Sequence, residues 1–439
     1  MATATRIQLS PSDTGVYSSN VREDSARVAS DILQENIERH HIYFNDKGFH
    51  NHIVHQVLSI YALGGTPEQI QVAYDREKKY QRPAFPANET VIESLHKEAA
   101  FEKCLEKEEN YPNFLAFFQR QIDKRGVEDV LNQYLFSGTT IAEQMFIRLF
   151  EGLLHPLIHL GFGIEFNQPA IIAEALAQTA VHRNTLHRFF QHTEALAGGV
   201  GQPGGLPLVE IMKQIQSSQK LTRSAHSDDN SRIHDGVLAR AFDEMVDAAA
   251  KYRVPADSLQ MKAAEMISNV VHYAAAAQQP GKQVKFDFFY IHGVNCSIFF
   301  PKLMSLSFVD VRARQRLLEC KGRMDLLIYV AYGAPSVYDA DGPKRPRYRA
   351  STDWETAFAH SVAHPDDDGH LPKLVRAIAY GERVCAPFAR NMDLPVKDED
   401  WRKIVNMVYD STAYTTPVTW IRGAGFEEAW AGVENASKL

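Results

Sequence analysis

Two histidines, His155 and His159, stand four residues apart in the otherwise apolar stretch from Glu151 to Gly161. On a helix, residues four apart lie one turn apart on the same face, which is the spacing that two imidazoles need to bind one metal ion. The apolar neighbours indicate that this face points inward, where a neutral imidazole must find partners for both ring nitrogens. Pro156, between the two, predicts a bend or a fresh helix start. A second interpretation is two separate core histidines bonded to backbone carbonyls.

Further histidines lie in segments with helical patterns. His52 and His55 are three apart in the helix expected from His50 to Gly65, so they share a face and form a second potential ligand pair. His292 is an isolated imidazole in an aromatic segment, where a core histidine bonded to protein groups is the ordinary alternative. Lys373 follows Pro372 at an expected helix start, where a lysine is ordinarily solvated.

Composition narrows the class of protein. The chain has 439 residues, 45% hydrophobic and 23% charged, as in ordinary globular proteins. The net charge of -7 does not indicate the basic surface that nucleic-acid binding requires. No window of the sequence has the roughly 18 apolar residues of a membrane span. The four cysteines form no CxxC pair and the first residues contain no apolar signal core, so we expect a reducing, cytoplasmic setting.

Several catalytic motifs are absent from the sequence. We find no GxGxxG between a strand and a helix, no GxSxG elbow and no HExxH motif. The glycine-rich segment 197–207 lacks the GK[ST] ending of a phosphate-binding loop and is interpreted as a linker. A Rossmann-type dinucleotide or flavin site is therefore not supported.

The pattern of apolar residues is helical along nearly the whole chain, with few period-2 runs. It predicts an all-α fold, a large multi-helix, bundle-like single domain over residues 21–439. Residues 1–20 are expected to form a flexible tail. Mobile loops are expected near 197–207, 222–231 and 333–350, where glycine, proline and polar residues gather.

Four histidine-bearing motifs occur in a fixed order, HNHIVHQVLSIYALG, GLLHPLIHLGFGIEF, FDFFYIHGVNCSIFF and HLPKLVRAIAYGE. In these motifs the chain resembles the questin oxidase-like family of fungal enzymes, over about residues 50–414. That family includes a Baeyer–Villiger-type oxidase of aflatoxin biosynthesis and enzymes that open the central ring of anthraquinones.

The resemblance implies a mononuclear non-haem iron dioxygenase that acts with O2 and Fe(2+). Its iron would be held by four histidines and a carboxylated lysine. Carried over by motif, the ligands are His55 (or His52), His155, His159, His292 and Lys373. His364 and His370 are neighbours of Lys373 that would orient it.

This ligand set is chemically coherent. Neutral imidazole suits iron, whereas a lysine ammonium would repel it. Burial lowers the pKa of a lysine, and the neutral amine can add carbon dioxide to form an anionic carbamate that replaces the usual carboxylate ligand.

The expected substrate is a polycyclic aromatic polyketide of the anthraquinone type, in fungal secondary metabolism. Phe289 and Trp354 are candidate walls of a flat apolar pocket, although aromatic residues in such segments are mostly core. The phenol would lose a proton, helped by the metal or a nearby histidine. A carbon–carbon bond beside the quinone carbonyl would then break.

Three other functions stay open at this point. The first is an NADPH-dependent Baeyer–Villiger-type oxidase, against which the missing dinucleotide motif counts. The second is a zinc hydrolase that uses the same histidines. The third is a non-catalytic helical binding protein whose histidines belong to the core.

Overall fold

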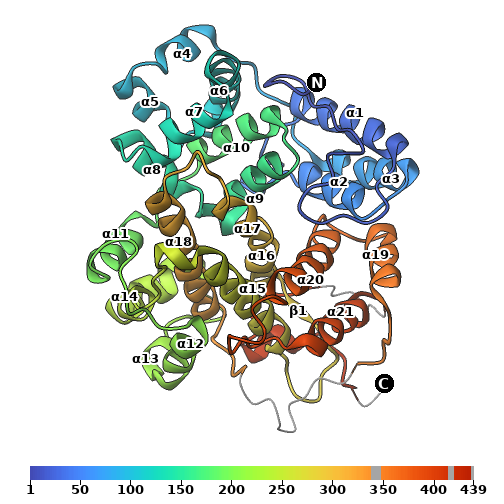
Figure 1. Cartoon of the computed structure of the whole chain (residues 1–439), viewed down its shortest axis with the longest axis vertical. Coiled ribbons are helices and arrows are strands. Elements are labelled where there is room, and N and C mark those ends of the chain that lie inside the picture. The colour runs from blue at the N-terminus through green and yellow to red at the C-terminus, as the bar shows by residue number, and fades with distance from the viewer. Residues whose placement is uncertain (338–347, 414–419, 437–439) are drawn as a thin grey trace. The chain divides into compact units, whose positions relative to one another are not determined.

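The computed structural model of the chain describes residues 1–337, 348–413 and 420–436 (Figure 1). These residues form twenty-one α-helices and one parallel pair of two-residue strands, β1 (Phe286–Asp287) and β2 (Trp420–Ile421). The all-α class predicted from periodicity is confirmed. From the sequence we expected a continuous helix from Phe286 to Ser307, and β1 occupies its first two residues.

The chain divides into two compact units, where we expected one domain. Unit 1 comprises Met1–His187, Ser305–Asp310 and Val362–Arg376. Unit 2 comprises the remaining segments, Arg188–Met304, Val311–Ser361 and Ala377–Leu439. Helix α20 (Leu371–Cys385) begins in unit 1 and continues in unit 2.

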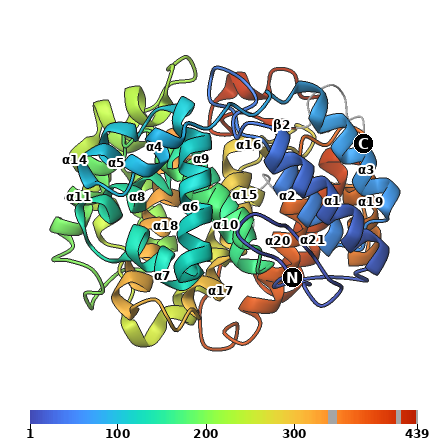
Figure 2. The ribbon, with the colours of Figure 1, turned by 90° about the horizontal axis from the view of Figure 1, so that it is seen from above.

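Unit 1 contains the first ten helices of the chain. They are α1 (Glu23–Arg39), α2 (Ile53–Ala62), α3 (Pro67–Glu77), α4 (Glu89–Ser94), α5 (Glu98–Cys104), α6 (Tyr111–Arg125), α7 (Val127–Leu131), α8 (Thr140–Arg148), α9 (Glu151–Glu165) and α10 (Pro169–Val181). Helices α1, α2 and α3 lie side by side (Figure 2).

Helix α10 is the core element of unit 1, and it packs on α9 and α6. All of its residues after Pro169 are buried, and five of them are alanines, which let neighbouring helices approach closely. Gly163 of α9 marks the closest approach, because a Cβ there would lie 2.7 Å from the Ile172 side chain. This close packing fixes α9, and with it the histidines that α9 carries.

Unit 2 contains, wholly or mainly, ten further helices. They are α11 (His187–Leu196), α12 (Leu208–Ser217), α13 (Gln219–Thr222), α14 (Phe242–Ala250), α15 (Leu259–Ala276), α16 (Phe288–Ser297), α17 (Phe300–Met304), α18 (Val311–Ala331), α19 (Trp354–Ala363) and α21 (Asp398–Ala413). Helix α18 runs through the interior of unit 2 and buries two ion pairs, Lys321–Asp325 and Arg323–Glu319.

Helix boundaries follow local chemistry. Thr66 forms a capping box with Gln69 ahead of α3, whose first residue is Pro67, as the sequence indicated. The sequence pattern over residues 168–196 indicates one helix, whereas the structure has two, α10 and α11. In the break between them, the Glu151 carboxylate accepts hydrogen bonds from the backbone N–H groups of Thr185 and Leu186, at 2.6 and 2.9 Å.

The first twenty residues form no helix, yet they make specific contacts within unit 1. Ile7 and Leu9 are buried. The backbone N–H of Leu9 donates to the Ser30 hydroxyl at 2.8 Å, and that of Val16 donates to the Glu165 carboxylate at 2.7 Å. This segment therefore packs against helices, where we expected a loose tail.

The loops expected near 197–207 and 222–231 lie between helices. The third expected loop, 333–350, falls partly outside the described residues. Within the described ranges, no helix combines the length and the apolar character that crossing a lipid bilayer requires.

Candidate functional site

A cluster of buried histidines lies in unit 1, and its first member stands at the beginning of α2. His52 occupies the N-cap position, so α2 begins later than the sequence indicated. The preceding Asn51 is buried: its side-chain oxygen accepts from the backbone N–H of Ile53 at 2.9 Å, and its amide donates to Asn36 at 2.8 Å. These bonds fix the backbone on which the His52 ring is held.

The second histidine follows a left-handed turn inside α9. Gly152, Leu153 and Leu154 have φ angles of 53°, 56° and 69°, which a leucine rarely adopts. The helix resumes at His155, directly before Pro156, as the fresh helix start that the sequence allowed. The turn brings the Gly152 carbonyl within 2.6 Å of His155 Nδ1. A bond from Nδ1–H to this carbonyl leaves the Nε2 atom to carry the lone pair.

The rings of His52 and His155 meet at their Nε2 atoms, which are 3.0 Å apart. Two ligands bound at right angles, each about 2.1 Å from a metal, lie about 3.0 Å apart. The same distance also suits an N–H···N hydrogen bond between neutral imidazoles. A ring nitrogen of His370 lies within 4.8 Å of ligand atoms of both His52 and His155, so the three side chains form a group that could hold a metal ion.

His370 is held by two aspartates at the start of α20. The Asp367 carboxylate accepts from the backbone N–H groups of His370 and Leu371, at 3.0 and 2.8 Å, and from the Gln56 side chain of α2 at 2.9 Å. Asp368 lies 2.7 Å from His370 Nδ1. A carboxylate on one ring nitrogen is the usual partner of a histidine that binds metal through the other.

Lys373 lies one turn after His370 and is buried. Its Nζ atom has no hydrogen-bond partner among the described residues. Burial lowers its pKa to about 8, partly opposed by Asp367, Asp368 and Glu77. An ammonium without a hydrogen bond is costly in such a place, so the site favours the neutral amine or a further group on Nζ.

His55 and His159 form a second pair behind this cluster. His55 Nε2 lies 3.2 Å from His159 Nδ1, and His159 Nε2 lies 3.5 Å from the buried Glu174 carboxylate. The His55 ring stacks on His155, with centroids 6.1 Å apart. Both histidines therefore lie beside the group formed by His52, His155 and His370, and one ring nitrogen of each is directed at the other.

The structure thus brings together three imidazoles from separate elements of unit 1. Between His52 and His55, which the sequence left open, the convergence with His155 favours His52. His370, expected as an orienting residue, offers a ligand atom itself. His364 makes loop contacts instead: its carbonyl accepts from Arg76 at 3.3 Å, and its Nδ1 lies 3.3 Å from the backbone N–H of Asp366.

Two histidines that we did not single out support the cluster. The His50 ring stacks on the His155 ring, with centroids 3.9 Å apart and planes inclined by 8°. His50 Nε2 lies 2.8 Å from His182 Nε2. The dense histidine content of the HNHIVH motif was a signal for His50, but nothing in the sequence indicated that His182 would join it.

Burial disfavours the charged form of three histidines in and beside the cluster. Desolvation lowers the pKa of His50, His52 and His55 well below the usual value, with smaller contributions from neighbouring histidines and Lys373. These three imidazoles therefore favour the neutral form, which is the state that metal binding requires.

His292, Phe289 and Trp354 belong to unit 2, and their predicted roles stay predictions. His292 is fully buried in α16, and its Nδ1 lies 2.6 Å from the Phe288 carbonyl. Phe289 stacks on Tyr332, with centroids 3.7 Å apart. Trp354 stacks on Phe358 at 5.8 Å.

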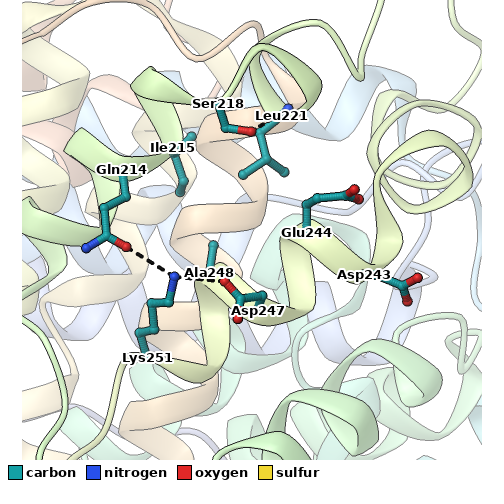
Figure 3. Close-up of a pocket in the computed structure, with 9 residues that line it drawn as sticks. All are labelled: Gln214, Ile215, Ser218, Leu221, Asp243, Glu244, Asp247, Ala248 and Lys251. Carbon is teal, nitrogen blue, oxygen red and sulfur yellow. Dashed lines mark hydrogen bonds and ion pairs between the residues drawn. The ribbon is translucent and has the colours of Figure 1, made fainter.

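Unit 2 also contains an open pocket of about 370 Å³ between α12, α13 and α14 (Figure 3). Asp243, Glu244 and Asp247 line it, and Lys251 bonds to Asp247 at 2.8 Å. Its lining contains neither histidine nor aromatic side chains, so it suits neither a metal–imidazole centre nor a flat phenol.

The fold and the histidine cluster define a class of protein: an all-α chain with a buried imidazole-rich centre. Comparison with known proteins then identifies the family. The family model described as questin oxidase-like matches residues 49–378.

Curated relatives cover almost the whole chain. The chain is 40% identical to the Baeyer-Villiger oxidase ptaJ of Pestalotiopsis fici, covering 98% of each protein, and 40% identical to the questin oxidase of Aspergillus fumigatus, covering 99% of each. It is 35% identical to the oxidoreductase AflY of Aspergillus parasiticus, over 96% of this chain and 86% of that protein. The chain is therefore an oxidoreductase. It belongs to the questin oxidase-like family, and the resemblance in its histidine motifs is confirmed.

Proposed function

We propose that the chain is a non-haem iron-dependent dioxygenase that cleaves a ring carbon–carbon bond of an anthraquinone-type polyketide. The observation that carries the proposal is the convergence of His52, His155 and His370 beside the buried Lys373. The names of the relatives, questin oxidase and Baeyer-Villiger oxidase, support oxidation of a polyketide in fungal secondary metabolism.

The residues present fit an iron ion. Neutral imidazole is a suitable ligand for ferrous iron, and the three rings come from separate elements, so their positions do not depend on one another's rotamers. His292 is proposed as the fourth imidazole on the strength of the family resemblance alone. When bound, iron supplies the oxygen chemistry that the side chains cannot perform.

Lys373 fits the carbamate that the resemblance implies. Its neutral amine can attack carbon dioxide, forming an N–C bond and releasing one proton. The product carries a negative charge, which offsets part of the charge of a divalent ion. The unpartnered Nζ atom and the lowered pKa are the observations that favour this modification.

The protein's own residues supply orientation and exclusion of water. Asp368 and the Gly152 carbonyl direct the Nδ1 atoms of His370 and His155, so that the Nε2 atoms face the convergence point. The chain neighbours Ile53 and Leu157 are fully buried, which favours a centre shielded from water. The proposed substrate binds as its phenolate, having given the phenolic proton to solvent, and the negative charge makes the ring electron-rich.

Iron content tests the ligand set directly. We expect stoichiometric iron in the wild type and a loss of most of it in His52→Ala, His155→Ala and His370→Ala. His96→Ala is the matched control, because His96 is an exposed histidine of unit 1 and its removal should leave iron unchanged. Normal iron in all three cluster variants would contradict the proposed site.

An NADPH-dependent Baeyer–Villiger oxidation is the second candidate, favoured by the names of several relatives. Oxygen uptake with a hydroxyanthraquinone separates the two. The dioxygenase proposal predicts uptake and ring opening without NADPH, whereas a strict NADPH requirement would favour the second candidate. Turnover without oxygen uptake would favour a zinc hydrolase.

A further inference from the structure

The first turn of α16 presents two aromatic rings, and a guanidinium lies over each. The Cζ atom of Arg422 is 4.3 Å from the centroid of the Phe288 ring. The Cζ atom of Arg232 is 5.9 Å from the centroid of the Phe289 ring. Both distances are within the range of cation–π contacts.

Arg232 is enclosed by further rings. Its Cζ atom is 5.5 Å from the Tyr332 ring and 5.4 Å from the Phe426 ring. It is the first residue of a π-helical segment, η4 (Arg232–Leu238), and π-helical turns are frequent at functional sites. Its Nη2 atom donates to the Ser227 carbonyl at 2.8 Å, which holds the planar group against the rings.

The positive charge of the two arginines is not neutralised. Neither guanidinium has a carboxylate within 4.0 Å among the described residues. The Nε atom of Arg232 is buried, and within those residues it has no hydrogen-bond partner. By contrast, Arg240 of the same unit forms a bidentate pair with Asp229. Two uncompensated cations against aromatic rings are an arrangement that attracts an anion.

The Asp287 side chain links the first turn of α16 to the segment that follows Arg422. Its buried carboxylate accepts from the backbone N–H groups of Phe289 and Tyr290, at 2.8 and 3.1 Å. It also accepts from those of Gly423 and Ala424, at 2.5 and 2.7 Å. The Asp287 side chain is thereby saturated by four backbone donors. It positions Arg422 beside Phe288 while its charge remains directed at the backbone.

We propose that Arg232, Arg422, Phe288, Phe289 and Tyr332 form a subsite for a planar aromatic anion, here called the arginine–aromatic cluster. The inference rests on the proposed function, because it identifies the ionised edge of the phenolic substrate as the group that is recognised. The half-buried Phe288 and Phe289 rings offer apolar surface, and the guanidiniums offer planar donors to a phenolate or carboxylate oxygen. The cluster adjoins His292, whose ring lies 4.8 Å from that of Phe288.

The test is binding of two flat probes to the protein as purified, measured under nitrogen so that no turnover occurs. One probe is a polyhydroxylated anthraquinone at a pH where it is ionised, and the other is its fully O-methylated, neutral counterpart. Quenching of protein fluorescence reports both affinities. Arg422→Gln and Arg232→Gln should weaken binding of the anion about tenfold or more and change binding of the neutral probe little. Arg390→Gln, an exposed arginine of unit 2, is the matched control.

A purely structural role of the arginines predicts a different result. If they only fasten the rings, Arg232→Gln lowers the melting temperature and weakens both probes equally, which overturns the proposal. Arg422 is exposed, so its variant is expected to fold and keeps the test informative. Equal affinity of the wild type for anion and neutral probe also overturns it. A preserved preference for the anion in a protein that consumes no oxygen would leave the subsite standing and contradict the proposed function.

Discussion

At the scale of single residues, burial sets the protonation states on which the site depends. Desolvation lowers the pKa of His50 and His52 well below the usual value, because burial penalises the charged imidazole. The same effect lowers the pKa of Lys373 to about 8, with no hydrogen bond among the described residues to compensate. A charged Lys373 is therefore costly to the fold, and a further group on Nζ would remove that cost.

Replacement of Lys373 separates these two effects. In metal-free, CO2-free protein, Lys373→Met should raise the free energy of unfolding at pH 7 by up to roughly 3 kcal/mol, since the wild-type amine is charged in the unfolded chain and disfavoured in the fold. The free-energy cost of burying the lysine is greatest below pH 8 and decreases as the pH rises toward 10.5. The gain in unfolding free energy of the variant should therefore decrease over the same pH range. Denaturant titrations at pH 7.5 and 9.5 measure it. The same variant should bind iron more weakly, and an unchanged iron affinity would argue against a carbamate ligand.

Glu77 provides a second residue-scale prediction, at the end of α3. Burial raises the pKa of this carboxyl to about 7, and Tyr80 donates a hydrogen bond to it. Because the folded-state pKa is raised, Glu77 binds a proton more tightly in the fold, and stability falls as the pH rises from about 4.5 to 7. Glu77→Gln should remove this dependence and gain up to roughly 3 kcal/mol at pH 8 relative to pH 5. Unfolding measured at both pH values checks it; parallel curves for variant and wild type would show the attribution to be wrong.

Residue spacing predicted the candidate donors but not their partners. The i, i+4 and i, i+3 spacings selected His155, His159, His52 and His55 as candidates. They could not show that His52 would lie at an N-cap, or that His55 and His159 would direct nitrogens at each other. Those facts depend on where a helix begins and on contacts between segments more than a hundred residues apart. His370 could have been predicted as a ligand from the sequence, because it is the first residue of the motif that contains Lys373.

At the scale of elements, the turn inside α9 is what directs His155. Three successive residues in the left-handed region cost free energy, and packing against α10 maintains them. Pro156 in the sequence suggested a break. The conformation itself was not predictable, because two of the three residues are leucines, which favour ordinary helix.

Gly152→Ala tests the importance of this turn. A Cβ at Gly152 would lie 2.7 Å from the His182 ring and 2.8 Å from the His50 ring, in addition to the strain of a φ of 53°. The matched control is Gly138→Ala, which has a φ of 71° and nothing within 4 Å of the added Cβ. Both variants should lose about 1 kcal/mol from backbone strain. Only Gly152→Ala should also lose iron, because it displaces the ring stacked on His155. Equal iron content in the two variants would show that the turn does not position the ligand.

At the scale of the whole molecule, the all-α class followed from the helical period of apolar residues. The division into two units did not, because each unit is assembled from three separate segments. Short-range patterns carry no information on which distant segments join. The packing of residues 1–20 was missed for a related reason, since a segment without periodicity can still be held by a few buried side chains such as Ile7 and Leu9.

Truncation tests the contribution of that segment. Removal of residues 1–12 exposes the surface covered by Ile7 and Leu9 and should lower the free energy of unfolding by a few kcal/mol, at roughly 1.5–3 kcal/mol for each buried side chain. Removal of residues 1–3 is the control, because it deletes exposed hydrogen bonds such as those to Arg6 and Gln8 and does not remove the buried side chains of Ala4, Ile7 and Leu9. Calorimetric or fluorescence melting compares the two. Equal melting temperatures for both truncations would indicate that the segment is not part of the stable fold.

The central claim is that imidazoles from α2, α9 and the start of α20 hold one iron ion. Iron K-edge X-ray absorption of the purified protein tests it most directly. The account predicts a first shell of nitrogen and oxygen scatterers with the outer-shell pattern of several imidazole rings, reduced in His52→Ala, His155→Ala and His370→Ala and unchanged in His96→Ala. A shell without imidazole, or one that none of the three substitutions alters, would contradict it.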